Sequence, residues 1–157
     1  YSEAAEAFEQ ATKLTPGKSL YWRNLGDASR WARGLRPKAA AAYQKGIARA
    51  RDEISTDPRD AWARVTLGLC LAKTGKPAEG LAEIQRALEI EPGNPDYFYD
   101  AAVVSNLLGR SEDAIGWLRR AVDGGLGVRQ IEAEPEFQNL RKLDSYRRVF
   151  SDAKKAA

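Results

Sequence analysis

Apolar residues in the stretch 61–92 recur at intervals of three and four positions, the spacing that places side chains on one face of an α-helix. The pattern is interrupted at Gly75, and Pro92 closes it. Glycine adopts a positive φ freely and therefore suits the end of a helix, while Pro77 suits the first turn of the next one. The pattern predicts two helices joined by a tight turn at Gly75.

The same pattern returns 34 residues later. The matching positions are Leu67 and Ala101, Gly75 and Gly109, Ile84 and Leu118, and Ala87 and Ala121. A fixed period of this length is typical of helix-turn-helix units that stack into a solenoid. We therefore expect an all-α fold, with the small residues Gly68, Gly80 and Ala87 where paired helices approach closely.

An earlier unit is longer than 34 residues. Pro16 and Pro58 lie 42 residues apart, whereas Pro58 and Pro92 lie 34 apart. One extra residue falls before Gly34, and the other seven fall within residues 45–58. Because seven residues make about two helical turns, the spacing predicts a second helix that is two turns longer than in the other units.

After Ala121 the pattern ends. Gly124, Gly125 and Gly127 stand where a closing proline is expected, and short amphipathic pieces follow as far as Phe150. The last unit of a stacked array needs a cover for its apolar face. We therefore expect residues 127–157 to form a C-terminal helical cap.

The units resemble the tetratricopeptide repeat family, whose pattern is an aromatic residue, Leu-Gly, a turn glycine, a small-aromatic-small trio and a closing proline. The matches in the first full unit are Trp22, Leu25, Gly26, Gly34, Ala39 and Tyr43. Those in the third are Phe98, Ala102, Gly109, Ala114, Leu118 and Ala121. Arg64 and Gly46 depart from it. The resemblance implies a right-handed solenoid with a half repeat (1–16), an extended repeat (19–60), two repeats (61–94 and 95–126) and the cap.

The chain offers little for catalysis. It contains no histidine, the usual general base and nitrogen metal ligand. Cys70 lies between Leu69 and Leu71 without a basic neighbour, which predicts a small buried side chain. Glycine-rich stretches lack the lysine and spacing of a phosphate-binding loop. We expect no enzyme activity within these residues, no cofactor and no metal site.

In the family that the chain resembles, the first helix of each repeat lines a concave groove. The corresponding positions here are Arg23, Asp27, Arg30, Trp31, Trp62, Val65, Leu69, Lys73, Tyr99, Val103 and Asn106. The resemblance implies that they bind a peptide or protein segment. Two alternatives remain: the tryptophans pack against neighbouring repeats, or the chain's own C-terminal helix occupies the groove.

Charge is unevenly distributed, although the net charge is only +3. Residues 18–51 hold nine basic side chains and one acidic side chain, whereas residues 79–100 hold six acidic and one basic. This asymmetry indicates either an ordinary solvated surface or one that orients a charged partner. The basic residues spread over several faces, so we expect no nucleic-acid binding. We also expect that copies of the chain can associate.

The sequence begins within the repeat pattern, at Tyr1, and contains no methionine, so we expect it to be a piece of a longer protein. No stretch approaches the roughly 20 apolar residues of a membrane-spanning helix, and we expect no membrane insertion. One cysteine fits a reducing compartment such as the cytoplasm.

The pattern favours a non-catalytic module that binds proteins. An alternative comes from the C-terminal segment, where Glu134-Pro135, Leu140-Arg141 and Tyr146 resemble the ends of many bacterial repeat arrays. Such arrays commonly follow kinase or sensory domains. The resemblance then implies a regulatory or substrate-recruiting tail of a signalling enzyme, such as a bacterial serine/threonine kinase.

Overall fold

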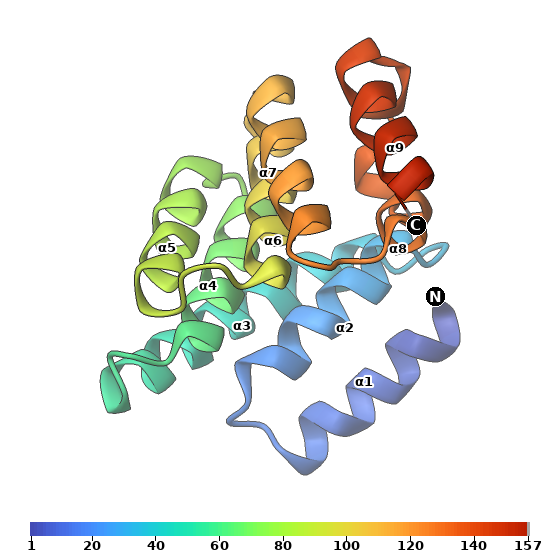
Figure 1. Cartoon of the computed structure of the whole chain (residues 1–157). Helices are drawn as coiled ribbons and strands as arrows, with labels where there is room; N and C mark the ends of the chain where they lie inside the picture. The colour runs from blue at the N-terminus through green and yellow to red at the C-terminus, as the bar shows by residue number, and fades with distance from the viewer. Residues whose placement is uncertain (157) are drawn as a thin grey trace. The chain divides into compact units, whose positions relative to one another are not determined.

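The structure is a computed structural model that describes the backbone of residues 1–156 and the side chains of residues 1–151. Within this part of the chain all regular structure is helical (Figure 1). The elements are α1 (Ser2–Leu14), α2 (Ser19–Trp31), α3 (Arg36–Thr56), α4 (Ala61–Lys73), α5 (Pro77–Ile90), α6 (Pro95–Leu107), α7 (Ser111–Asp123), α8 (Val128–Ala133), η1 (Pro135–Phe137), η2 (Leu140–Lys142) and α9 (Asp144–Ala156). The all-α prediction is confirmed.

Consecutive helices pack in pairs, α2 with α3, α4 with α5 and α6 with α7. The tight turn of each pair contains a glycine in the left-handed region: Gly34, Gly75 and Gly109 have φ angles of 80°, 92° and 74°. A residue with a Cβ atom would be strained in this conformation. The helix-turn-helix units predicted from the repeat pattern are therefore confirmed.

The extended second helix of the first full unit is also confirmed. Helix α3 has 21 residues, against 14 in α5 and 13 in α7. Its added turns keep the helical spacing of the apolar face, so that Ala50 is buried and Ile54 packs against the same core cluster as Ile47. The insertion therefore lengthens the helix without interrupting its contact with α2 and α4.

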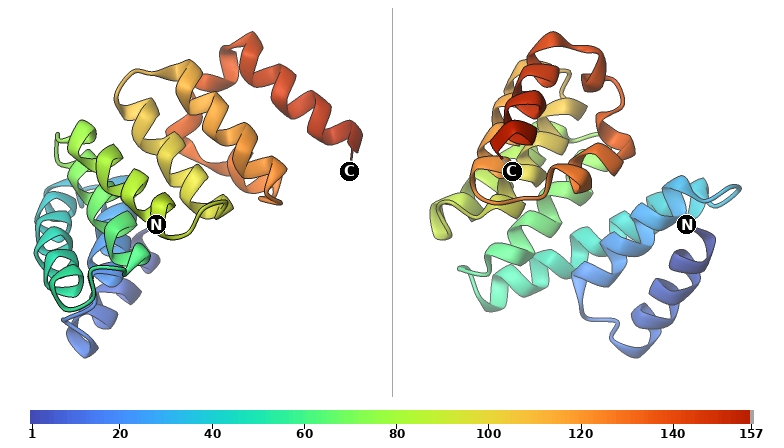
Figure 2. Two further views of the ribbon diagram at one scale, coloured as in Figure 1. Left: turned by 60° about the vertical axis from the view of Figure 1, so that its left-hand side comes forward. Right: turned by 45° about the vertical axis from the view of Figure 1, so that its right-hand side comes forward.

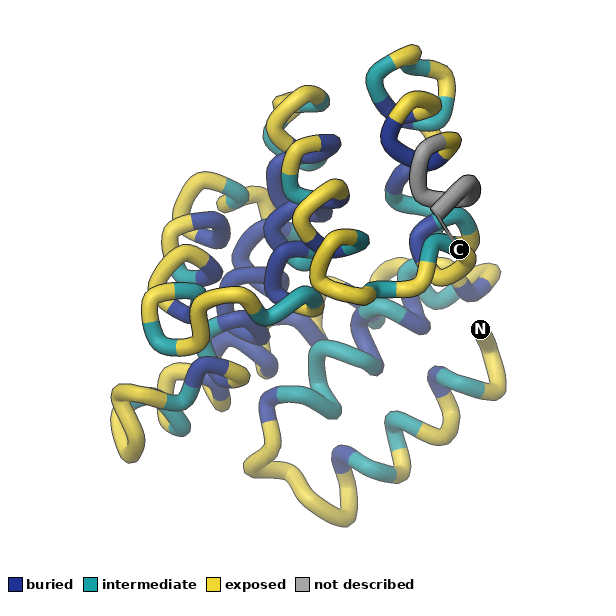
Figure 3. Tube along the Cα trace, in the orientation of Figure 1, coloured by how far each residue is buried: buried dark blue, intermediate teal, exposed yellow. Residues whose placement is uncertain are grey.

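The chain divides into two compact units, unit 1 (Tyr1–Ile90) with α1 to α5 and unit 2 (Glu91–Ala157) with α6 to α9. In unit 1, α4 is buried along most of its length, while α5 exposes one side (Figure 3). This burial explains why α4 is apolar almost all round.

In unit 2 the expected cap packs on the third repeat, with η1 against α6 and α9 beside α7 (Figure 2). The segment contributes six buried hydrophobic side chains, which are Ile131, Phe137, Leu140, Tyr146, Val149 and Phe150. The apolar faces of α6 and α7 are thus covered by the chain's own C-terminal segment.

Helices α4 and α5 approach most closely at two glycines. A Cβ atom added at Gly68 would lie 2.6 Å from the carbonyl oxygen of Gly80 and 2.8 Å from Cγ1 of Ile84. Ala87, further along α5, is fully buried. The prediction that small residues permit this close approach is confirmed.

Replacing Gly68 with alanine should lower the free energy of unfolding of unit 1 by about 1–2 kcal/mol. Overpacking costs about 1–3 kcal/mol, and the higher helix propensity of alanine returns up to about 1 kcal/mol. Gly116 in α7 has no atom within 4 Å of an added Cβ, so Gly116→Ala should stabilise by about 0.5–1 kcal/mol. Urea denaturation measures both effects. Equal gains from the two substitutions would contradict the close approach of α4 and α5.

Candidate functional site

Helices α2 and α4 contact each other within unit 1 and carry eight of the predicted groove residues. Two of these, Val65 and Leu69, are 0% and 4% exposed and lie in the interior, where they present no surface to a partner. The other six lie at the surface or partly buried, and we call the surface they form the α2–α4 face. Its residues are Arg23, Asp27, Arg30, Trp31, Trp62 and Lys73.

Asp27 is the centre of a polar network on this face. Its Oδ1 accepts a short hydrogen bond from Nζ of Lys73 and another of 2.8 Å from the hydroxyl of Tyr43. Nε of Arg23 lies 3.9 Å from its Oδ2. The Lys73 side chain is only 8% exposed and that of Asp27 is 33% exposed. The network joins α2, α3 and α4, so its main effect is to hold two repeats together.

The electrostatics of the network keep Asp27 ionised. Burial raises the pKa of this carboxyl, but the positive charges of Lys73 and Arg23, with the hydrogen bonds from Lys73 and Tyr43, hold its pKa below the usual 3.8. Burial, and then the adjacent Asp27 carboxylate, raise the pKa of Tyr43 far above its ordinary value. At neutral pH the network therefore contains the Asp27 carboxylate and the protonated Tyr43 phenol.

The two tryptophans of the α2–α4 face are partly accessible to a partner. Trp31 is 38% exposed at the end of α2, and the Arg30 guanidinium carbon lies 5.6 Å from its ring centroid. Trp62 is 49% exposed and lines a pocket of about 230 Å³ at the start of α4. The polar side chains around that pocket include Glu53 and Asp60.

Glu53, to which no sequence motif pointed, binds the first residue of α2. It accepts hydrogen bonds from the Ser19 backbone N–H at 3.3 Å and, at a short distance, from the Ser19 hydroxyl. Lys18 lies 3.7 Å from the same carboxylate. The residue is in the extension of α3, so the added turns supply a cap to a neighbouring helix. The only sequence signal for Glu53 was its place within the seven-residue insertion of the first full repeat.

In unit 2 the predicted residues of α6 contact the chain itself. The hydroxyl of Tyr99 donates to Oε2 of Glu134 at 2.5 Å, and its ring meets that of Phe137 edge-on, with centroids 5.5 Å apart. Burial, and then the hydrogen bond to Glu134, raise the pKa of the Tyr99 hydroxyl. Val103 is 4% exposed.

Asn106 completes these contacts. Its Nδ2 donates to the backbone oxygen of Glu136 at 2.7 Å, and its side-chain amide exchanges two hydrogen bonds with that of Asn139, at 3.0 and 2.8 Å. We call residues 134–139 the strap. The sequence left open that the C-terminal helix occupies the groove, but in unit 2 the segment that bonds to Tyr99 and Asn106 is the strap, which precedes α9.

Neither the α2–α4 face nor the contact between α6 and the strap brings together described side chains suited to catalysis. Burial, followed by the nearby charge of Asp27, raises the pKa of Cys70 to about 12, so its thiol stays protonated at neutral pH. Over the part of the chain that is described, no group of three potential metal ligands occurs. Likewise, none of the described helices combines the length and apolar character needed to cross a bilayer.

Comparison with known protein families identifies the repeat. The Tetratricopeptide repeat model matches residues 1–53, 29–95 and 71–125. The chain belongs to the tetratricopeptide repeat family. Membership makes it a protein-interaction module, built on a scaffold that is generally non-catalytic.

Solved structures agree on the architecture. A thermophilic tetratricopeptide repeat protein of Thermus thermophilus superposes with a TM-score of 0.62 at 19% identity, covering 89% of this chain and 72% of the other. A MamA RS-1 double mutant superposes with a TM-score of 0.50 at 17% identity, covering 85% and 69%. At these identities the likeness shows the fold. No curated protein matches the sequence significantly.

Arg64 departs from the tetratricopeptide pattern, yet it makes the contact that an aromatic residue makes elsewhere in the array. Nε1 of Trp22 donates to the carbonyl oxygen of Pro16 at 3.0 Å, six residues earlier. Nη2 of Arg64 donates to the carbonyl oxygen of Pro58 at 2.8 Å, again six residues earlier. Its Nη1 also lies 3.0 Å from Oε2 of Glu83 on α5. The departure therefore preserves the contact with the preceding proline.

Proposed function

We propose that this protein-interaction module binds a peptide or protein segment along the α2–α4 face. The observation that carries the proposal is the exposure of Trp31 and Trp62 on this face. Among the described residues, the other large hydrophobic side chains that are exposed are Tyr1 and Leu14, in or next to α1. Exposed tryptophans provide broad and fairly rigid apolar contacts, which commonly dominate binding energy.

Basic residues near Trp31 favour acidic groups in the partner. Arg33 and Arg36 are exposed in and after the turn that follows α2, and Arg30 lies over the indole. The Asp27 carboxylate accepts hydrogen bonds from Lys73 and Tyr43, so its negative charge is largely offset and repels an acidic partner little. We therefore propose a segment with apolar anchors and acidic residues, since charges of this sign would speed its association.

The contacts that the strap makes with α6 favour unit 1, and not the third repeat, as the binding site. Tyr99 and Asn106 of α6 occupy the corresponding predicted positions, but their polar groups already bond to Glu134, Glu136 and Asn139. A partner would have to displace these contacts to use α6. Among the predicted groove residues, the large apolar side chains that are exposed are those of Trp31 and Trp62.

Replacing Trp62 with alanine should weaken binding of the partner segment by about 2 kcal/mol or more, about 30-fold in Kd, if Trp62 is a hot spot. The partner would first be captured with the intact chain from the source organism, and calorimetry on purified components would then measure Kd. Leu14→Ala is the matched control, because Leu14 is 84% exposed and belongs to α1, which carries none of the residues of the α2–α4 face.

Equal affinity of the Trp62→Ala, Trp31→Ala and wild-type chains would place the binding surface elsewhere and contradict the proposal. The identity of the captured partner also separates the alternatives. A kinase substrate or a kinase domain would favour a regulatory tail, and a second copy of this chain would favour self-association. We propose a cytoplasmic location for this interaction, which suits the reduced Cys70 thiol.

A further inference from the structure

The pocket beside Trp62 lies at one end of the α2–α4 face, and we call it the Trp62 pocket. It is lined by the starts of α2 and α4, among them Tyr21 and Trp62, and by Glu53 near the end of α3. Its volume of about 230 Å³ lies below the roughly 300–1,000 Å³ of small-molecule sites. The pocket therefore suits one side chain of a larger partner better than a separate ligand.

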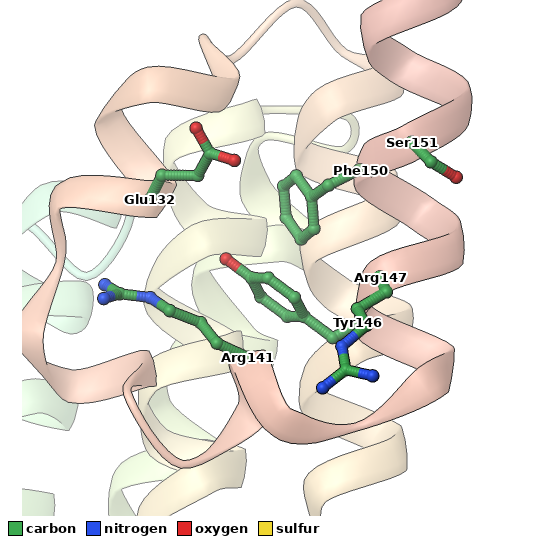
Figure 4. A pocket seen from close by; sticks show the side chains of 6 residues that line it. All are labelled: Glu132, Arg141, Tyr146, Arg147, Phe150 and Ser151. Atoms are coloured by element: carbon green, nitrogen blue, oxygen red, sulfur yellow. The ribbon is translucent and has the colours of Figure 1, made fainter.

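A larger cavity, of about 440 Å³, lies in the C-terminal segment of unit 2 (Figure 4). Its aromatic residues, Tyr146 and Phe150, are each 4% exposed, so their rings offer almost no surface to a ligand. The guanidinium groups of Arg141 and Arg147 lie on opposite sides of Tyr146 and do not converge on one point. The Trp62 pocket differs, because its indole is 49% exposed.

Carboxylates give the Trp62 pocket an excess of negative charge. Glu53 and Asp60 line it, against the cation of Lys18 among the described residues. Glu53 accepts two hydrogen bonds from Ser19, and Asp60 accepts one of 2.8 Å from the Ala63 N–H. A carboxylate has about four acceptor sites, so both groups retain capacity for a donor from a partner.

The chain itself already brings a cation to this pocket. Nζ of Lys18 lies 3.7 Å from Oε1 of Glu53, while the lysine side chain is 62% exposed. Exposed ion pairs contribute little to stability, so Lys18 can move aside at small cost. A basic side chain of a partner can therefore take its place beside Glu53.

The indole of Trp62 adds a second means of binding a cation. Tryptophan is the strongest of the aromatic side chains in cation–π contacts. A guanidinium group stacks on aromatic faces and pairs with carboxylates through two parallel hydrogen bonds, whereas an ammonium group acts as a point charge. An exposed indole next to two carboxylates therefore favours arginine over lysine.

The basic side chains of the face lie at its other end. Helices α2 and α4 run side by side with their starts together, because the Trp62 pocket joins both starts and Lys73, at the end of α4, bonds to Asp27. Counted along the helices at about 1.5 Å per residue, the pocket and Trp31 are about 20 Å apart. The exposed arginines of the turn after α2 lie next to Trp31 in the sequence. The two ends therefore differ in charge.

We propose that the segment bound by the α2–α4 face inserts an arginine side chain into the Trp62 pocket. The guanidinium group bonds to Glu53 and Asp60 and stacks on the indole. This inference rests on the proposed function and specifies its partner, which carries an arginine at one anchor and acidic residues about 20 Å away at the other. The opposite charges then fix the direction of the segment on the face.

The test is an NMR titration of the full chain, labelled with ¹⁵N, with acetyl-Leu-Arg-Leu-amide and with its glutamine and lysine counterparts. The arginine peptide should cause saturable shifts of the amides around residues 18–21, 53 and 60–66. The glutamine peptide should bind at least about five-fold more weakly, because it lacks the charge. The lysine peptide should bind about two-fold or more weakly, because it cannot make the paired hydrogen bonds.

Asp60→Asn should weaken binding of the arginine peptide about three-fold or more. Asparagine caps a helix as well as aspartate does, so α4 keeps the hydrogen bond from the Ala63 N–H and loses only the charge. Lys18→Gln should strengthen binding, since it removes the competing cation. Asp57→Asn is the matched control, because Asp57 is exposed and does not line the pocket.

Four results would overturn the inference. They are the absence of saturable shifts with millimolar arginine peptide, equal binding of the arginine and glutamine peptides, equal binding of the arginine and lysine peptides, and equal losses in Asp60→Asn and Asp57→Asn. Failure of the proposed function gives a different result. Trp31→Ala should leave binding of the tripeptide unchanged, because Trp31 is about 20 Å from the pocket, while it weakens binding of the captured partner. A partner that depends on both tryptophans, with no response to the arginine peptide, would retain the face and remove only the arginine.

Discussion

Phe137→Ala should lower the free energy of unfolding of unit 2 by about 3–5 kcal/mol, because it removes a fully buried aromatic side chain. The loss should spread to α6, since Phe137 meets Tyr99 there and the strap holds Asn106 through Glu136. Hydrogen–deuterium exchange of the full chain measures the effect as faster exchange in α6 and α8, and urea denaturation measures the free energy.

Gln138→Ala is the control for this substitution. Gln138 is exposed and follows Phe137 directly, so its replacement should change the stability by less than about 0.5 kcal/mol. Unchanged protection of α6 in Phe137→Ala would mean that the strap is dispensable. In that case Tyr99 and Asn106 would return as candidates for contact with a partner.

Lys73→Met should destabilise unit 1 by about 2–3 kcal/mol. Breaking a buried ion pair typically costs about 3–5 kcal/mol, because one charge is left uncompensated. The expected loss is smaller here because Asp27 is 33% exposed and keeps its hydrogen bond from Tyr43. Methionine retains most of the apolar stem, so the substitution mainly removes charge. Denaturation monitored by tryptophan fluorescence measures it.

The double variant Asp27→Asn/Lys73→Met should recover at least about half of this loss, since no unpaired charge remains. The pH dependence provides a second check. The pKa of Asp27 is lowered in the folded state, so its contribution is complete above pH of about 4 and disappears as the pH falls through the lower folded-state pKa. A stability of Lys73→Met equal to wild type at neutral pH would contradict the role of the pair.

Local signals predicted the helices well. Gly75 lies at a positive φ between α4 and α5, and α5 begins at Pro77, because turn geometry depends on the residue in the turn itself. The length of α3 followed from counting residues between prolines. The burial of Cys70 followed from its apolar neighbours Leu69 and Leu71, and that of Ala87 from its place where paired helices approach closely. All of these features depend on residues that are close in the sequence.

The partners of the candidate site residues could not be predicted in the same way. Asp27 and Lys73 are 46 residues apart, and Tyr99 and Glu134 are 35 apart. Their contacts depend on how helices stack and on the path of the strap, which helical periodicity does not specify. Val65 shares a helical stripe with Trp62, but stacking buried one and left the other exposed.

The hydrogen bond from Trp22 to Pro16, and its counterpart from Arg64 to Pro58, have a consequence for protein engineering. In both cases the donor lies in the first helix of a repeat and the acceptor lies in the linker before that helix. A repeat cut out at its first helical residue would lose the acceptor carbonyl, which would stay with the array from which the repeat was taken. The transferable cassette for grafting or duplication therefore starts at the proline, and either tryptophan or arginine can serve within it.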